Sequence, residues 1–570
     1  MSNKNILPVA LGKEKADLVF KNGKIMDVFN EEIILKDLAV SKGVIVGFGN
    51  YSGKKEIDLK GQYISPAFID AHLHLESAMV SIEEFAKVVI PLGTLTIVAD
   101  PHEIANVAGE TGIEYFLKLG NKLPWNFNLM VPSCVPVTPF DAGGAILDAE
   151  KIKQLITENT FFGLGEVMDY KGVISGRKYI WDKLEVMKDY FIDGHAPNLT
   201  GEALNAYLLA GIKADHETTT SHEALEKVSK GMFVMVREGS VTRDLESLLP
   251  AINDKNASYF LFATDDRHPE DLINEGHINF IVKKAIKLGM NPIKAIKLAT
   301  INAARALGLN KLGALAPGYK ADLLVIDDLK DLNIKQVYKD GKLVAKNGQF
   351  LFETQLDSLE KPEKIFHSVN IVQLKEEVFK IPKGKKFRIM TLQKDKIVTK
   401  MEVFTLPDDF EESEFTRYNI NKIAVVERFK RSNNIGLGLI KGFGLKSGAI
   451  ASSIAHDSHN IIVLGTNSID MKIAVEKIEA LQGGIVVTNN GKVIDFIALP
   501  VAGLISTEPI SIVSEKLRNL KSIVNSLGVE LASPFMTLAF MGLPVIPEIK
   551  ITCRGLYDVD NNCFVSLVLE

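Results

Sequence analysis

Eight short apolar runs, separated by stretches with helical spacing, constrain the fold of this 570-residue chain more than any other feature. The intervening segments, such as 81–90, 149–158, 201–209 and 222–230, have the length and apolar spacing of connecting helices. Eight β/α units within about 240 residues match a TIM-type (β/α)8 barrel in number and size, and favour it over a doubly wound open sheet. The apolar runs are residues 67–71, 94–99, 127–132, 161–165, 190–194, 211–214, 231–236 and 259–263.

The segments on either side of the barrel predict a second, composite domain. Short β-like runs with tight turns such as Asn22-Gly23 fill residues 16–64, and a similar pattern returns after residue 310. Neither piece is long enough for a core of its own, so we predict one small β-sandwich with the barrel inserted in it. The predicted division is 1–65 together with 308–353 for the sandwich, 66–307 for the barrel, 354–375 for a polar linker and 376–570 for a C-terminal α+β domain.

Composition excludes several classes of partner. The net charge of −5 gives no electrostatic footprint for nucleic acid or an anionic membrane surface. No apolar run approaches the roughly 18 residues needed to span a bilayer, and residues 1–15 lack the apolar core of a signal peptide. Three scattered cysteines are too few for a disulfide framework. We therefore expect a cytoplasmic protein that acts on a small molecule, and a closed homo-oligomer, a dimer or larger.

Polar groups follow nearly all of the predicted strands. In a barrel these strand ends meet on one face, where the active sites of such barrels lie. Side chains two apart on a strand point the same way, so His72 and His74 can face one metal ion. The imidazoles and carboxylates are too many for one tetrahedral ion and suit two divalent ions with a bridging carboxylate. The candidate metal ligands are His72, His74, Glu166, His195, His216 and Asp265.

The order and spacing of seven motifs carry a resemblance to a known family. They are Phe68-Ile-Asp-Ala-His-Leu-His-Leu-Glu-Ser77, Ala99-Asp-Pro-His-Glu-Ile104, Gly163-Leu-Gly-Glu-Val-Met168, Asp193-Gly-His195, Ala214-Asp-His-Glu-Thr218, Val236-Arg-Glu-Gly-Ser240 and Thr264-Asp-Asp-Arg267. The chain resembles the amidohydrolase superfamily and, within it, the adenine deaminases of bacteria and archaea. Relatives such as dihydroorotases and hydantoinases carry a carboxylated lysine on strand four, where this chain has Glu166. That difference favours the adenine deaminase branch.

The resemblance implies metal-dependent hydrolytic deamination of adenine to hypoxanthine and ammonia, a step of purine salvage, with manganese or iron as the metal. A metal-bound hydroxide is expected to attack C6 of the base, while Asp265 shuttles protons. Glu238 is the candidate for a second proton carrier or for an acceptor from the purine edge. The expected walls of the base pocket, or alternatively groups that orient the ligands, are Glu76, Ser77, Asp100, His102, Arg237 and Ser240.

Two alternative functions stay open at this point. Another dinuclear amidohydrolase would act on a cyclic amide or an acyl amine. A non-catalytic relative would keep the fold as a scaffold, but six intact ligand positions weigh against that. The late His456-Asp-Ser-His459 cluster either lines an approach to the active site or caps local structure.

Overall fold

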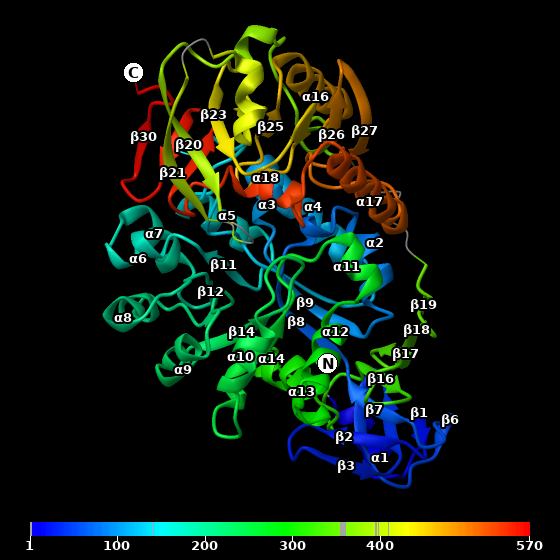
Figure 1. Cartoon of the computed structure of the whole chain (residues 1–570). Coiled ribbons are helices and arrows are strands. Elements are labelled where there is room, and N and C mark those ends of the chain that lie inside the picture. Colours follow the sequence, from blue (N-terminus) through cyan, green and yellow to red (C-terminus); the bar gives the residue numbers. More distant parts are fainter. Residues whose placement is uncertain are drawn as a thin grey trace.

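The computed structural model describes residues 3–140, 142–353, 361–393, 396, 398–407 and 410–569. Figure 1 shows three parts in a row. The small β domain, with its blue N-terminal strands, lies at one end, the barrel lies in the middle, and the yellow-to-red C-terminal domain covers the other end of the barrel. In the part of the chain that the structure describes, no helix has the length and apolarity needed to cross a bilayer.

The eight predicted runs form eight strands of a parallel barrel, so the predicted fold class is confirmed. Neighbouring strands pair in parallel in three groups, β8 to β10, β11 with β12, and β13 to β15. Bridges from Val131 to Leu164 and from Leu73 to Asp265 join the first group to the other two. The Lys213 N–H donates to the Ile192 carbonyl at 3.0 Å, which connects β12 to β13 and closes the ring. The strands are β8 (Phe68–Leu73), β9 (Thr94–Ala99), β10 (Asn126–Leu129), β11 (Gly163–Val167), β12 (Phe191–Gly194), β13 (Ala214–Asp215), β14 (Phe233–Arg237) and β15 (Phe260–Ala263).

Alternation along the strands divides the buried side chains between two cores. On β14, Met235 packs with Ile69 and Leu261 in one apolar cluster, whereas Val234 and Val236 belong to the cluster that includes the surrounding helices. Successive side chains of a strand point to opposite faces, so the first cluster fills the barrel and the second lies between barrel and helices. This alternation also decides which polar residues at the strand ends can reach the barrel axis.

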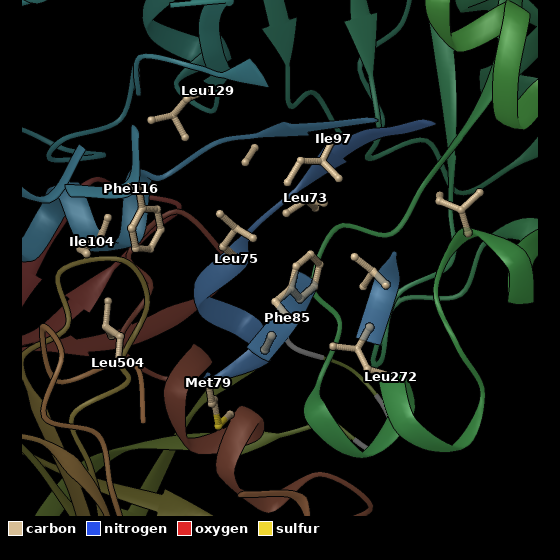
Figure 2. Close-up of a cluster of buried hydrophobic side chains, with 14 of the residues drawn as sticks. Leu73, Leu75, Met79, Phe85, Ile97, Ile104, Phe116, Leu129, Leu272 and Leu504 are labelled. Atoms are coloured by element: carbon tan, nitrogen blue, oxygen red, sulfur yellow. The ribbon is translucent and has the colours of Figure 1, made fainter. Parts of the chain in front are cut away.

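Helices cover the barrel where the sequence predicts them. They include α2 (Ile82–Val89), α5 (Ala149–Glu158), α8 (Gly201–Leu209) and α9 (Ser221–Ser229). Helix α2 begins after Ser81, whose Oγ accepts the Glu84 N–H at 3.2 Å, a favourable N-cap. Phe85 of α2 packs among Leu73, Ile97 and Phe116, and Figure 2 shows Leu504 of the C-terminal domain at the edge of the same core. Burial of each such side chain contributes about 1.5–3 kcal/mol.

Both flanks of the barrel contribute to one sheet of the small β domain. Strand β7 (Tyr63–Pro66) pairs antiparallel with β16 (Leu323–Ile326). On the β7 side the sheet continues with β2 (Lys24–Asp27) and β3 (Glu32–Leu35), and on the β16 side it continues with β17 (Ile334–Lys339) and β18 (Lys342–Lys346). A second sheet holds β1 (Ala16–Lys21), β4 (Leu38–Ser41), β5 (Val44–Phe48) and β6 (Gly53–Asp58). Strands from before and after the barrel share hydrogen bonds in the first sheet, whereas all four strands of the second precede the barrel.

The C-terminal domain is built on an eight-stranded mixed sheet. Its central strands β22 (Ile420–Val426), β25 (Ile461–Gly465) and β24 (Ala449–Ser452) are buried along their whole length, and α16 (Ser468–Leu481) packs against them. Helix α17 (Ile510–Ser526) and the hairpins of β28 (Ile549–Thr552), β29 (Gly555–Asp558) and β30 (Cys563–Val565) complete it. Ser506 bridges to Val80 and Asn460 donates to the Ala142 carbonyl at 2.8 Å, so this domain sits on the carboxyl ends of the barrel strands.

The predicted linker 354–375 falls only partly on described residues, because 354–360 lie outside them. In the described part, Ile365, Val369, Ile371 and Leu374 are buried in the cores that the C-terminal domain contributes to. We propose the domain division that the sequence predicts, with residues 361–375 assigned to the C-terminal domain rather than to a linker.

Candidate metal centre

The strand ends bring all six predicted metal ligands together. The Nε2 atoms of His72 and His74 lie 3.2 Å apart. Asp265 Oδ1 lies 3.2 Å from the His74 Nε2 and 3.7 Å from the His72 Nε2. His72 lies on β8 and His74 directly after it, and Asp265 is the second residue after β15, which adjoins β8 where the barrel closes. Ligand candidates that lie far apart in the sequence are therefore close together in space.

Glu166, at the end of β11, faces a different set of imidazoles with each oxygen. Its Oε1 lies 3.3 Å from His74 Nε2, while its Oε2 lies 2.5 Å from His195 Nδ1 and 3.3 Å from His216 Nε2. Two groups with the spacing of metal ligands result, His72 with His74 and Glu166, and Glu166 with His195 and His216. The His195 side chain is 22% exposed, so the second group opens towards solvent. A carboxylate shared by both groups is placed to bridge two ions.

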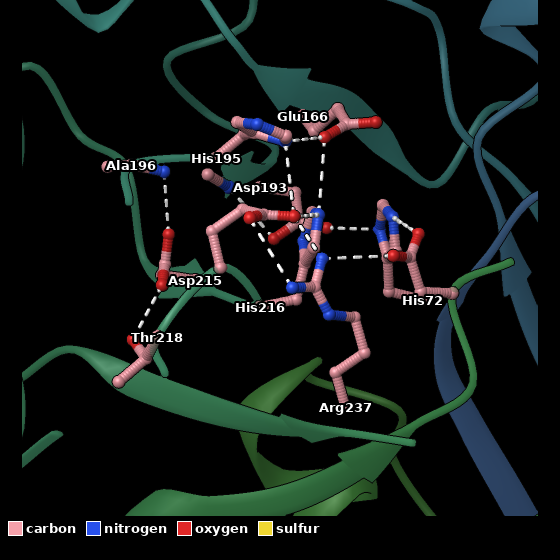
Figure 3. A network of polar contacts seen from close by, with 12 residues as sticks. His72, Glu166, Asp193, His195, Ala196, Asp215, His216, Thr218 and Arg237 are labelled. Atoms are coloured by element: carbon pink, nitrogen blue, oxygen red, sulfur yellow. Dashed lines mark hydrogen bonds and ion pairs between the residues drawn. The ribbon is translucent and has the colours of Figure 1, made fainter. Parts of the chain in front are cut away.

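The outer nitrogens of the first two imidazoles are held by acceptors. His72 Nδ1 donates to Asp193 Oδ2 at 2.8 Å, and His74 Nδ1 donates to the Asp100 carbonyl at 3.0 Å. In their neutral forms both rings then direct an Nε2 lone pair at the other, an arrangement that a cation between them stabilises. Figure 3 shows His72, His195, His216 and Glu166 converging in this way.

Electrostatics at the centre favour positive charge. Burial alone would lower the pKa of the His216 imidazole, but Glu166 and Asp265 raise it to about 10. Burial alone would raise the pKa of the Glu166 carboxyl group, but the neighbouring histidines hold it well below its ordinary value. For Asp265 too, burial would raise the pKa, and His74 and Arg237 hold it well below its ordinary value. The two carboxyl groups are thus anionic, the state that a metal ligand needs, and the donor set fits two divalent ions.

Asp265 is fixed by backbone as well as by side-chain contacts. Its N–H donates to the His72 carbonyl at 3.0 Å, and its φ of 57° lies in the left-handed region that non-glycine residues adopt at a cost. Its Oδ2 accepts from the Arg237 guanidinium at 3.1 Å, which leaves Oδ1 directed at the histidines. The two oxygens therefore have different partners.

Glu217 is a site residue that the sequence-based assignment left out. It follows His216 directly, its carboxylate pairs with the Arg237 guanidinium, and its Oε1 lies 3.9 Å from His216 Nε2 and 4.0 Å from His195 Nδ1. The signal was its position at the end of the sixth apolar run, beside a predicted ligand. It stands at the more exposed side of the centre, with a side chain that is 17% exposed.

Glu238 does not lie where the sequence-based assignment expected it. Its Oε1 accepts from Lys284 Nζ at 2.7 Å, its Oε2 accepts the Leu245 N–H at 3.2 Å, and it is fully buried. Since Arg237 points to the barrel axis, the next residue of the strand points away from it. The Glu238 carboxylate is therefore directed at Lys284 and the Leu245 backbone rather than at the histidines.

The remaining predicted pocket residues fall into two groups. Glu76 Oε1 accepts the Ile104 N–H, and Asp100 Oδ2 accepts the Glu166 N–H, both at 2.9 Å. His102 Nδ1 lies 3.4 Å from Glu166 Oε1. Asp100 and His102 thus flank Glu166, whereas Glu76 holds the backbone of Ile104. Ser77, which donates to Asp266, and Ser240, whose Oγ accepts the His268 N–H at 2.8 Å, sit instead on the loops at the carboxyl end of the barrel.

The fold and this centre define a class of protein, and comparison with known proteins agrees. The family model described as the amidohydrolase family matches residues 63–344, and the one described as the adenine deaminase C-terminal domain matches residues 396–563. The chain is 73% identical over 570 residues to the adenine deaminase of Petrotoga mobilis, with all of both chains covered. It is 46% identical to adenine deaminase 2 of Carboxydothermus hydrogenoformans, with 99% of each covered. It is 45% identical to the adenine deaminase of Clostridium acetobutylicum, with 98% of each covered.

The chain is thus an amidohydrolase-superfamily protein. Within that superfamily it belongs to the adenine deaminase family, as the motifs predicted. Family membership and the buried imidazole–carboxylate cluster together indicate that it uses divalent metal.

Proposed function

We propose that this protein hydrolyses adenine to hypoxanthine and ammonia. The observation that carries the proposal is Glu166, whose two oxygens face two separate groups of imidazoles at the end of the barrel. Its full-length relatives bear the name adenine deaminase, which agrees with this reaction.

The metal proposed for the centre is manganese or iron. Four imidazoles and two carboxylates, with no thiolate among them, suit borderline to hard divalent ions. His72 and His74 with Asp265 would hold one ion, His195 and His216 the other, and Glu166 would contact both. When bound, two such ions lower the pKa of a water molecule to near neutrality and so supply the nucleophile for C6 of the base.

Proton transfer is assigned to two carboxylates. Asp265 Oδ1 faces the histidines while Arg237 holds its Oδ2, so one oxygen can accept a proton from the attacking water and deliver it to the ring or the leaving amine. Glu217 takes the second role that the sequence suggested for Glu238, because its carboxylate lies beside His195 and His216 and faces the more open side of the centre. Arg237 holds both carboxylates in place.

The base is proposed to lie between the centre and the loops that carry Ser77 and Ser240, with Arg237 behind the two proton carriers. Glu76, Asp100 and His102 serve instead to position Glu166 and its surroundings, because their polar atoms are directed at it or at nearby backbone. Positioning groups of this kind typically change metal affinity or activity by about 10–100-fold when removed.

The test is ammonia release by the full chain loaded with manganese or iron and offered adenine, adenosine, cytosine, a cyclic amide and an N-acyl amino acid. The proposal predicts release from adenine alone or by a wide margin. Turnover of the cyclic amide or the acyl amine without release from adenine would assign the centre to another amidohydrolase reaction. Protein that is purified without bound metal and gains no activity on loading would support a scaffold role.

A further inference from the structure

Buried polar atoms without a hydrogen-bond partner collect where the C-terminal domain meets α3 (His102–Ala108). Among the described residues they include His102 Nδ1, Asp457 Oδ2, His456 Nε2 and His459 Nε2. These residues are no more than 5% exposed. Folded proteins leave few buried polar groups unsatisfied, and a cluster of them indicates a bound group that the polypeptide does not supply.

Three of the side chains at this junction form a set of metal-ligand type. A ring nitrogen of His102, the Sγ of Cys134 and a carboxylate oxygen of Asp457 all lie within 4.8 Å of one another, and all three residues are buried. They come from three separate segments, the start of α3, the loop after β10, and the loop that precedes β25. Nitrogen, sulfur and oxygen donors in one set are characteristic of zinc or cobalt rather than of manganese.

A second set nearby, Glu103 with His456 and His459, is less suited to a cation. His456 Nδ1 lies 2.8 Å from Glu103 Oε1, and His459 Nδ1 accepts the Ala455 N–H at 3.3 Å. That acceptor role leaves the proton of neutral His459 on Nε2, so this nitrogen has no lone pair for an ion. Glu103 and His456 thus form an ion pair that anchors the loop, and the set around Cys134 is the better cation site.

Cys134 has two different sides. Val137, Met168 and Leu543 pack with it in one apolar cluster, as they would around any small buried side chain. Its other side faces His102 and Asp457, which a purely apolar role does not explain. Asp100 Oδ1 is a further buried oxygen without a partner, and Asp100 Oδ2 lies 3.9 Å from His102 Nδ1.

We propose that His102, Cys134 and Asp457 bind a third divalent cation, zinc or cobalt in type, which ties the C-terminal domain to the barrel. Binding replaces the thiol proton of Cys134, which is released to solvent. Because His102 also lies 3.4 Å from Glu166 Oε1, the same ion would fix an imidazole beside the bridging carboxylate. The inference does not depend on which substrate the centre acts on.

Cobalt loading of the metal-free full chain tests this site, because only Cys134 would give a thiolate ligand. We expect three cobalt ions per chain by elemental analysis and a thiolate-to-cobalt charge-transfer band in the near ultraviolet. Cys134→Ser should bind two ions and lose the band. Cys563→Ser, which alters an exposed thiol, should keep both the third ion and the band. Asp457→Asn should weaken the third ion at least 10-fold, which provides a second test if the Cys134 variant folds poorly.

Two cobalt ions per chain and no charge-transfer band in the native protein would overturn the proposal, even if that protein releases ammonia from adenine. It would also be overturned if Asp457→Asn raised the KM for adenine while the native and variant chains both bound two ions. That result would assign Asp457 to the substrate. The two outcomes separate a failure of the third site from a failure of the proposed reaction.

Discussion

Asp193→Asn is the most informative change outside the ligands themselves. Asp193 Oδ1 accepts the Gly194 N–H at 2.8 Å, and its Oδ2 accepts from His72 Nδ1 at 2.8 Å, with both side chains 1% exposed. An asparagine that keeps its oxygen on Gly194 presents an NH₂ group to His72. The imidazole must then accept at Nδ1 and carry its proton on Nε2, the atom that would bind metal.

The expected magnitude follows from that change of tautomer. Loss of an acceptor behind a metal-binding histidine costs about 10–100-fold in metal affinity, or about 1.4–2.7 kcal/mol. Asp193→Ala removes only the acceptor and should fall near the lower end, because water can replace the carboxylate. Asp193→Asn imposes the wrong tautomer and should exceed the upper end.

The assay is calorimetric titration of the metal-free chains with manganese, with ammonia release from adenine at each metal concentration as the second readout. We expect the native chain to bind manganese most tightly, Asp193→Ala less tightly and Asp193→Asn most weakly. Equal affinities for the two variants, or an asparagine variant that binds as the native protein does, would refute the role assigned to Asp193.

Three further changes test other parts of the account. Asp265→Asn should lower kcat by about 10²–10⁴-fold with a much smaller change in KM, since it removes a proton carrier; a kcat within threefold of native would exclude that role. Glu217→Gln should lower kcat by at least about 10²-fold, whereas Glu238→Gln should act mainly on stability, so the reverse order in steady-state kinetics would restore Glu238 as the carrier. Lys227 Nζ lies 2.8 Å from Asp215 and 2.7 Å from Glu223, so Lys227→Met leaves two buried carboxylates without their partner and should lower the free energy of unfolding by about 3–5 kcal/mol in chemical denaturation. Lys178→Met, which removes an exposed ion pair, should change the free energy of unfolding little. Equal effects of the two changes would contradict the reasoning.

Lys227 contributes to stability rather than to chemistry, because the carboxylate that it holds is directed away from the metal centre. Asp215, which Lys227 holds, accepts the Ala196 N–H at 2.7 Å and the Thr218 hydroxyl at 2.7 Å, away from the converging histidines. The buried cluster ties the loop after β12 to α9. It supports the strand ends that carry His195 and His216 without touching the centre.

The barrel could be predicted because its signals are local. Each strand overlaps an apolar run of the sequence, and each run ends at the face where the polar residues gather. His72 and His74 could be paired from their spacing alone, since residues two apart on a strand share a face. Their convergence with Glu166 then followed from the closure of a barrel.

Other features depend on information that no local pattern holds. Arg237 and Glu238 are adjacent at one strand end, and only the register of β14 decides that the first faces the axis. Glu217 could likewise be assigned to the site only once the direction of its side chain was known. His456 and Asp457 reach the barrel from a domain far away in the sequence, and the apolar Ile365 and Val369 were hidden among the charged residues of a segment that reads as polar.

Manganese titration of the metal-free chain, with ammonia release from adenine followed at each step, tests most directly the claim that Glu166 joins two metal ions in one deaminating centre. Manganese avoids thiolate ligands, so the titration reports on the imidazole and carboxylate groups. The account predicts that activity rises until two manganese ions are bound per chain and that Glu166→Gln abolishes the second binding event. Full activity with one ion bound, or two ions bound without release of ammonia from adenine, would contradict it.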